Sequence, residues 1–218
     1  MDPLRPILCL ITDRRRFAAP WETALVERVR VAAQAGVHLI QVRERDLEGG
    51  PLARLVERCV DAVRGTRARV LVNDRLDVAL AARAHGVHLR GDSIDAARVR
   101  RITPAGFLIG RSVHSVEDAF LAGADGSLDY LMFGAVFETA SKPGVVAAGL
   151  DRLARVSAAT AVPVLAIGGI SATNAAGAGR AGASGIAAIG LFADGAVDAM
   201  PALVARISAA FDTPERVP

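Results

Sequence analysis

The chain has 218 residues, and because no linker, low-complexity run or composition break interrupts its interior, we expect a single domain over residues 1–218. A net charge of +3 comes with arginines interleaved with acids and no basic stripe with aromatics, which argues against nucleic acid as a partner. No apolar run reaches the length of a membrane span, and the N-terminal residues lack a signal-peptide cleavage site. We therefore expect a cytoplasmic protein with no membrane partner.

Short apolar segments without polar alternation recur along the chain, as in strands that are buried on both faces. They span residues 7–12, 37–42, 70–72, 86–89, 107–110, 130–133, 164–167 and 186–189. Segments with helical spacing separate them: from Pro20 to a stop at Gly36, 51–63, 76–83, after Asp92 or Ser93, from the capping box at Ser115, 150–159, from Ser171, and a last one to about Phe211. The tail after about residue 212 is expected to fray. Eight such units at this length predict an α/β protein with the (β/α)8 TIM barrel fold.

Polar residues and glycines follow the predicted strands at their C-terminal ends, which is the face where barrel enzymes build their sites. They are Arg43, Asn73, Asp74, Ser112, His114, Thr139, Lys142, Gly168, Gly169 and Gly190. His114 is the best acid–base candidate, because the unperturbed pKa of histidine suits proton transfer near neutral pH. His38 and His88 lie within strands, where a histidine is more often a packing residue.

The glycines after the last two strands predict a phosphate site. Gly168, Gly169, Gly190 and Leu191 would present backbone N–H groups at helix starts, where the helix dipole favours an anion. The alternative is that these are tight turns that need only glycine.

Three further groups favour an anionic ligand. Arg43 and Arg45 have the two-residue spacing that aims side chains the same way in extended chain, unless they pair at the surface with Glu44 and Asp46. Asn73-Asp74 offers an amide and a carboxylate to a phosphate or to Mg²⁺, although Asn-Asp is also ordinary turn chemistry. Lys142 is the only lysine in the chain and stands in a polar loop with Thr139 and Ser141; the alternative there is a solvated loop.

Several ordered motifs together resemble the thiamin phosphate synthase and thiazole tautomerase (TenI-type) family. They are LITD at 10–13, QVRERD at 41–46, NDR at 73–75, GVHL at 86–89, IGRSVHSVEDA at 109–119, FGAVFETASKPG at 133–144 and AIGGI at 166–170. The resemblance covers nearly the whole chain. It implies a TIM barrel in thiamin biosynthesis that handles a small thiazole phosphate, and a homodimer would be compatible with it.

For a synthase, the resemblance implies that the pyrimidine pyrophosphate is held by Arg43, Arg45, Asn73, Ser112, Thr139, Ser141 and Lys142. It also implies Mg²⁺ between two aspartates, of which Asp74 matches the first. Ser93 stands where the second is expected, Asp92 lies one residue early, and Arg90 adds a positive charge.

For a tautomerase, the resemblance implies no metal or other cofactor, with the histidine at position 114 as proton carrier. The segments SVHS and FGAVFET are closer to this branch. We therefore expect an isomerase, a thiazole tautomerase that aromatises a carboxythiazole phosphate. The alternative is the synthase, which is a transferase, and a second alternative is a regulator that binds a phosphorylated metabolite without turnover.

Overall fold

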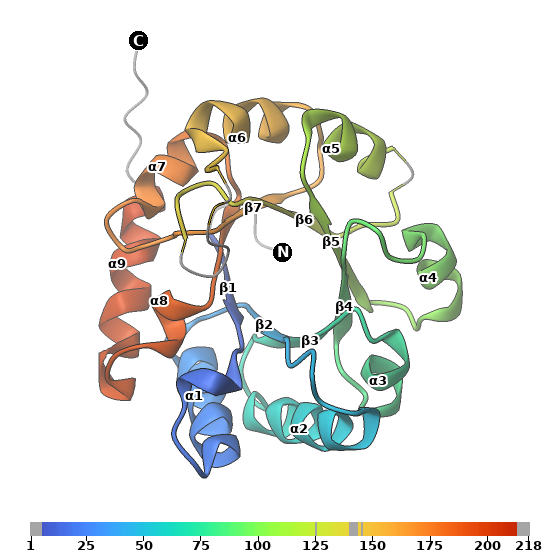
Figure 1. The fold of residues 1–218 in the computed structure, drawn as a ribbon, viewed down its shortest axis with the longest axis vertical. Helices are drawn as coiled ribbons and strands as arrows, with labels where there is room; N and C mark the ends of the chain where they lie inside the picture. Colours follow the sequence, from blue (N-terminus) through green and yellow to red (C-terminus); the bar gives the residue numbers. More distant parts are fainter. Residues whose placement is uncertain (1–5, 125, 140–143, 145, 213–218) are drawn as a thin grey trace.

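Eight parallel strands form a closed barrel, each paired with its neighbours in sequence and the last with the first (Figure 1). The computed structural model describes residues 6–124, 126–139, 144 and 146–212. The strands are β1 (Ile7–Ile11), β2 (Leu39–Val42), β3 (Arg69–Asn73), β4 (Gly86–Leu89), β5 (Leu108–Val113), β6 (Tyr130–Phe133), β7 (Val164–Ile167) and β8 (Gly185–Ala188). The expected TIM barrel is confirmed.

Helices surround the strand ring and cover its outer face (Figure 1). They are η1 (Arg14–Arg16), α1 (Trp21–Ala35), α2 (Gly49–Ala62), α3 (Leu76–Ala81), α4 (Ala96–Ile102), α5 (Val116–Ala122), α6 (Gly149–Ala158), α7 (Ala175–Arg180), α8 (Gly190–Ala193), η2 (Val197–Ala199) and α9 (Met200–Asp212). Within the described part of the chain, no helix is long and apolar enough to cross a membrane. The tail expected to fray, from residue 213 on, lies outside the described residues.

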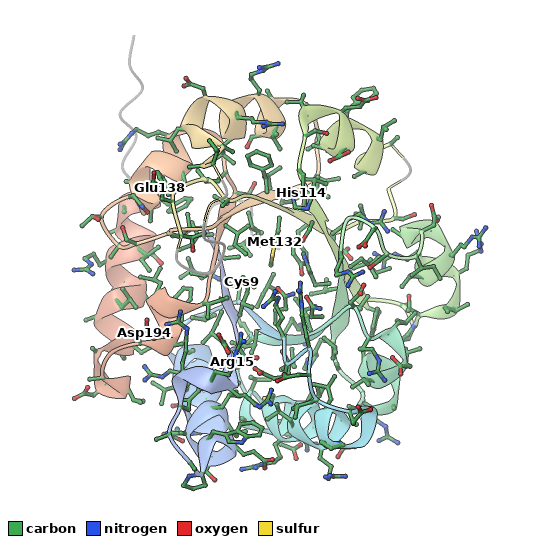
Figure 2. All side chains as sticks on the ribbon, in the orientation of Figure 1. Cys9, Arg15, His114, Met132, Glu138 and Asp194 are labelled. Carbon is green, nitrogen blue, oxygen red and sulfur yellow. The ribbon has the colours of Figure 1, made fainter. Side chains whose placement is uncertain are left out.

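The apolar residues form two cores, because successive side chains of a strand point to opposite faces. The larger core lies between strands and helices, and the smaller one fills the barrel with residues such as Cys9, Met132 and Leu165. Cys9 and Met132 lie within the strand ring in Figure 2. Tyr130 is fully buried there and needs Gly110 beside it, since a Cβ at Gly110 would lie 2.0 Å from the Tyr130 ring. The interior is therefore a packed core.

Local signals set several element boundaries as expected. Gly36 ends α1 in the left-handed conformation, with φ 103°. The capping box opens α5: the Ser115 hydroxyl accepts a hydrogen bond from the Asp118 N–H, and the Asp118 carboxylate accepts one from the Ser115 N–H.

Three expected boundaries were wrong. β5 continues to Val113 instead of ending at Gly110, because pairing with β4 and β6 outweighs the polar character of its last residues. The helix expected at Asp92 or Ser93 is capped by Asp95 instead. The helix expected from Ser171 begins only at Ala175, and the Ser171 hydroxyl closes the preceding turn by accepting a hydrogen bond from the Asn174 N–H.

Candidate active site at the carboxyl ends of the strands

Four inward-facing polar side chains line the barrel mouth on consecutive strands β2 to β5: Gln41, Asn73, His88 and Ser112. Gln41 is buried, and its Nε2 donates to Asn73 Oδ1 at 2.9 Å. This bond uses the Asn73 carbonyl oxygen, and no other described residue accepts a hydrogen bond from its amide N–H groups, which suit a ligand. The buried Gln41 Oε1 has no hydrogen-bond partner among the described residues. A buried acceptor of this kind is suited to a ligand donor or a water.

His88 holds Ser112 in place from inside the barrel. Its Nδ1 lies 3.0 Å from the Tyr130 hydroxyl and its Nε2 lies 2.9 Å from Ser112 Oγ. Complete burial lowers the pKa of His88 to about 3, so the ring is neutral at physiological pH. A neutral imidazole donates from one nitrogen and accepts at the other, which orients both hydroxyls. His88 is thus an interior packing residue, as expected, and it also positions an expected site residue.

A buried carboxylate ties the ends of β1 and β2 together. Glu44 is 4% exposed; it accepts from Thr12 Oγ1 at 2.6 Å and from the Arg14 N–H at 3.1 Å. Burial raises the pKa of Glu44. Thr12 in turn accepts from the Arg43 N–H at 3.0 Å, which fixes the backbone that carries the next arginine. Thr12 and Glu44 were not predicted as supports of the site, although they stand in the motifs LITD and QVRERD.

Arg43 and Arg45 follow β2 and place positive charge at the mouth. Arg43 is half-buried, and burial, followed by the neighbouring Arg45, lowers its pKa. In the described part of the chain the Arg43 guanidinium has no ion pair or hydrogen bond, so the alternative of a surface pair with Glu44 or Asp46 is not formed, and Arg14 pairs with both acids instead. Arg45 is exposed and borders the cleft at the mouth. A half-buried cation without a partner is suited to an anionic ligand.

Asp74 lies at the end of β3 with its carboxylate already occupied. Its backbone has a positive φ of 61°, and its N–H donates to the His88 carbonyl at 2.9 Å. Oδ1 accepts a hydrogen bond from the Ser93 hydroxyl, and Oδ2 lies 3.3 Å from Arg90 Nε. Among the described residues no group of three or more His, Cys, Asp and Glu side chains is arranged to hold a metal. Because Ser93 stands where the second aspartate is expected and Arg90 pairs with both Asp74 and Asp92, the described residues do not fit the two-aspartate Mg²⁺ site that the resemblance implies for a synthase.

His114 is exposed just past β5, near the ends of β5 and β6 (Figure 2). Its N–H donates to Asp118 Oδ2 at 3.0 Å, and its ring lies beside Gly91, where a Cβ would be 3.6 Å from Cδ2. It borders a cleft of about 800 Å³ whose polar lining also includes Arg45, Arg90, Asp92, Arg111 and Ser112. The structure therefore brings His114 together with the expected binding residues Arg45 and Ser112.

The glycines after β7 are required by packing. Gly168 and Gly169 have φ of 97° and 64°, and a Cβ at Gly169 would lie 2.2 Å from the Glu138 carbonyl oxygen. The Phe137 N–H donates to the Gly168 carbonyl at 3.0 Å, so the loop after β6 rests on the loop after β7. Tight packing alone explains both glycines. We expected a helix to start directly after them, but α7 begins only at Ala175.

At β8 the N–H groups of Gly190 and Leu191 open α8. Within the described chain they donate no hydrogen bond to another residue, so they are free for a ligand. Phosphate binding by the backbone of Gly168, Gly169, Gly190 and Leu191 stays a prediction.

Two expected ligands, Ser141 and Lys142, lie outside the described residues, so the expectation that Lys142 faces the same cavity as His114 stays a prediction. Thr139 is described and half-buried. Figure 2 shows Glu138, its neighbour, on the α7 side of the barrel, well apart from His114.

Comparison with known proteins assigns the chain to a family. The family model described as "Thiamine monophosphate synthase" (TMP-TENI) matches residues 8–192. The chain belongs to the thiamine monophosphate synthase family. A thiamine-phosphate synthase of Chlorobium luteolum is 37% identical over 165 residues, covering 75% of this chain and 74% of that protein. One of Roseiflexus castenholzii is 41% identical over 162 residues, covering 74% of this chain and 69% of that protein. A solved thiamine phosphate pyrophosphorylase from Pyrococcus furiosus matches with a TM-score of 0.80 at 32% identity, covering 95% of this chain and 96% of that chain.

These relatives correct the expected activity. We expected the tautomerase branch, an isomerase, from SVHS and FGAVFET, but these family relatives are named synthases, so that expectation was wrong. The short segments misled because they cover only two of the eight loops at the mouth. The similarity to the synthases extends over about three quarters of the chain.

Proposed function

We propose that the chain is a thiamine-phosphate synthase, a transferase that joins a pyrimidine pyrophosphate to a thiazole phosphate and releases pyrophosphate. The observation that carries the proposal is the identity of 37–41% to proteins named thiamine-phosphate synthase. The mouth supports it, because the Asn73 N–H groups, the Ser112 hydroxyl, and Arg43 and Arg45, which pair with no described residue, suit a highly charged diphosphate.

In this reaction the thiazole nitrogen attacks the methylene carbon of the pyrimidine, and the bond from that carbon to the pyrophosphate oxygen breaks. The electron pair leaves with the pyrophosphate, so negative charge grows on the leaving oxygen and no proton is transferred. Preorganised cations and N–H donors near that oxygen would stabilise the transition state more than the ground state. Catalysis would thus depend on charge placement more than on an acid or base.

We assign the pyrophosphate to the β2–β6 side of the mouth and the thiazole phosphate to the β7–β8 side. The proposed pyrophosphate ligands are Arg43, Arg45, Asn73, Ser112, Thr139, Ser141 and Lys142. The proposed ligands of the thiazole phosphate are the N–H groups of Gly168, Gly169, Gly190 and Leu191. Neighbouring subsites would bring the two reacting atoms together, which by itself lowers the barrier.

Mg²⁺, which the resemblance implies for a synthase, would have Asp74 as its one matching ligand. Because that carboxylate is already bound by Arg90 and Ser93, we derive no step through a metal.

The test is to incubate purified protein with both substrates and to follow thiamine phosphate by conversion to fluorescent thiochrome, with pyrophosphate release measured in parallel. We expect both products in equal amounts, at a rate proportional to enzyme concentration, and none when the thiazole phosphate is omitted. Binding of both substrates without product would contradict the proposal and favour the non-catalytic regulator.

A further inference from the structure

We propose that the Arg90 guanidinium takes the place of the divalent cation at the pyrophosphate subsite, so that this chain binds a diphosphate without a metal. The inference rests on the proposed function for the choice of ligand. The side chains present differ from the two-aspartate Mg²⁺ site that the resemblance implies for a synthase, because Ser93 and Arg90 stand at its position.

Arg90 lies between two carboxylates, as a metal would. Its Nε is 3.3 Å from Asp74 Oδ2, and its Nε and Nη2 donate to the two Asp92 oxygens, each at 3.0 Å. The Ser93 hydroxyl donates to the other Asp74 oxygen, so each Asp74 oxygen already has a donor beside it. Mg²⁺ demands near-octahedral oxygen coordination at about 2.0–2.1 Å, so an ion at this carboxylate would have to displace the Arg90 guanidinium.

The loop that carries Arg90 is held in place by hydrogen bonds. The Arg90 N–H donates to Ser93 Oγ at 3.0 Å, so this one hydroxyl joins Arg90 to Asp74. Arg111 Nη2 donates to the carbonyls of Ser93, at 3.3 Å, and Ile94 from the adjacent strand β5. The position of Arg90 is therefore set by two neighbouring strand ends, β3 and β5, as well as by its own.

Arg90 still has donors for a ligand. Its Nη1 makes no hydrogen bond or ion pair to any described residue, and the side chain borders the cleft that contains Ser112 and His114. One guanidinium carries half the charge of Mg²⁺, and Arg43 and Arg45 supply the rest. Neither has an ion-pair partner in the described part of the chain, so both guanidiniums keep their donors for a ligand. Planar guanidiniums also bind phosphate oxygens in pairs, which a point charge does not.

The first experiment measures binding of inorganic pyrophosphate by calorimetry, in EDTA and again in Mg²⁺. We expect binding in EDTA, with a Kd that changes less than about threefold when Mg²⁺ is present. Because Arg90→Gln removes one charge-assisted contact, we expect it to weaken pyrophosphate binding roughly 10- to 100-fold in EDTA. The control is Arg98→Gln, an exposed arginine on α4 outside the cleft lining, which should bind as the parent does. Parent binding that disappears in EDTA, or an Arg90→Gln protein that binds normally, would overturn the inference.

The second experiment uses Mn²⁺ alone and electron paramagnetic resonance. We expect no bound Mn²⁺ in the parent and a bound ion in the double variant Arg90→Gly, Ser93→Asp, which removes the guanidinium and supplies a second carboxylate. A parent protein that binds Mn²⁺ with micromolar affinity would refute the inference, and this measurement decides it even if the double variant does not fold.

Neither readout needs turnover. Pyrophosphate binding in EDTA without thiamine phosphate synthesis would refute only the proposed function. Synthesis with strictly metal-dependent pyrophosphate binding would refute only the role of Arg90.

Discussion

The two halves of the barrel mouth are held together by different kinds of contact. Between β1 and β5 the mouth consists of side chains held by one another, as in the pairs Gln41–Asn73 and His88–Ser112. Between β6 and β8 its described residues are held by backbone contacts, with Gly168 and Gly169 packed against Ala135, Phe137 and Glu138. In the first half a substitution removes a side-chain contact, whereas in the second a Cβ at Gly168 or Gly169 would lie within 2.6 Å of neighbouring backbone. Substitutions should therefore affect chemistry in one half and stability in the other.

The largest effect is expected in the backbone half, from Gly169→Ala. The new Cβ would lie 2.2 Å from the Glu138 carbonyl oxygen at a φ of 64°. Overpacking and left-handed strain together predict a loss of about 2–4 kcal/mol in unfolding free energy, or roughly 5–15 °C in Tm. Thermal unfolding by circular dichroism measures it. Gly106→Ala is the control, since its φ of 77° is similar but its Cβ would have nothing within 4 Å. Equal losses of unfolding free energy in the two variants would show that backbone strain alone, and not close packing, makes glycine necessary at position 169.

The next effect belongs to the side-chain half. Arg43→Gln removes a half-buried cation that has no partner in the described chain, and burial already lowers its pKa. We expect Tm to stay equal or rise, while kcat/KM for thiamine phosphate formation falls roughly 10- to 100-fold, as for loss of one charge-assisted contact. Steady-state kinetics and thermal unfolding on the same preparation separate the two effects. A fall in Tm with unchanged kinetics would make Arg43 a structural residue and would break the comparison.

The interior support of the side-chain half should respond to pH. The pKa of His88 is about 3 in the folded state, well below the unfolded value of 6.5, so below pH 6.5 the unfolded chain binds a proton that the native one does not. The free energy of unfolding is therefore not reduced by this group above pH 6.5, and it decreases as the pH falls from 6.5 toward 3. Between pH 7.5 and 5.5 the parent should lose about 1.4 kcal/mol more than His88→Gln. Urea unfolding at the two pH values tests this, and parallel losses in both proteins would contradict it.

The smallest effect is expected at His114, between the two halves. A displacement that transfers no proton does not need an acid or base, so His114→Ala should reduce kcat less than about tenfold, against 10²–10⁴ for loss of a general acid or base. The control is Glu117→Ala, because Glu117 is exposed like His114 and lies nearby, on α5. A loss above a hundredfold would give His114 a proton-transfer role and would contradict the proposed chemistry.

The sequence by itself determined the barrel and the face on which the site lies. Unbroken apolar segments such as Tyr130–Phe133, separated by helical segments, allow little besides parallel strands in a closed sheet. Because all the strands then run the same way, the polar residues that follow them meet at one end. For this reason the order of residues along the chain is enough to predict that Arg43, Asn73 and Ser112 lie at the same end of the barrel. Capping at Ser115 and the stop at Gly36 were equally readable, since both depend on residues within one helical turn.

Only the tertiary structure decided which of these residues hold one another. Arg90 pairs with Asp74, His88 with Tyr130 and Ser112, and Thr12 with Glu44, across 16 to 42 positions of sequence. A local pattern contains no information on such pairs, because they depend on which strands become neighbours and in what register. The same reason explains Gly169: its need for glycine comes from a carbonyl oxygen on the loop after β6, which only the closed barrel brings within 2.2 Å of its missing Cβ.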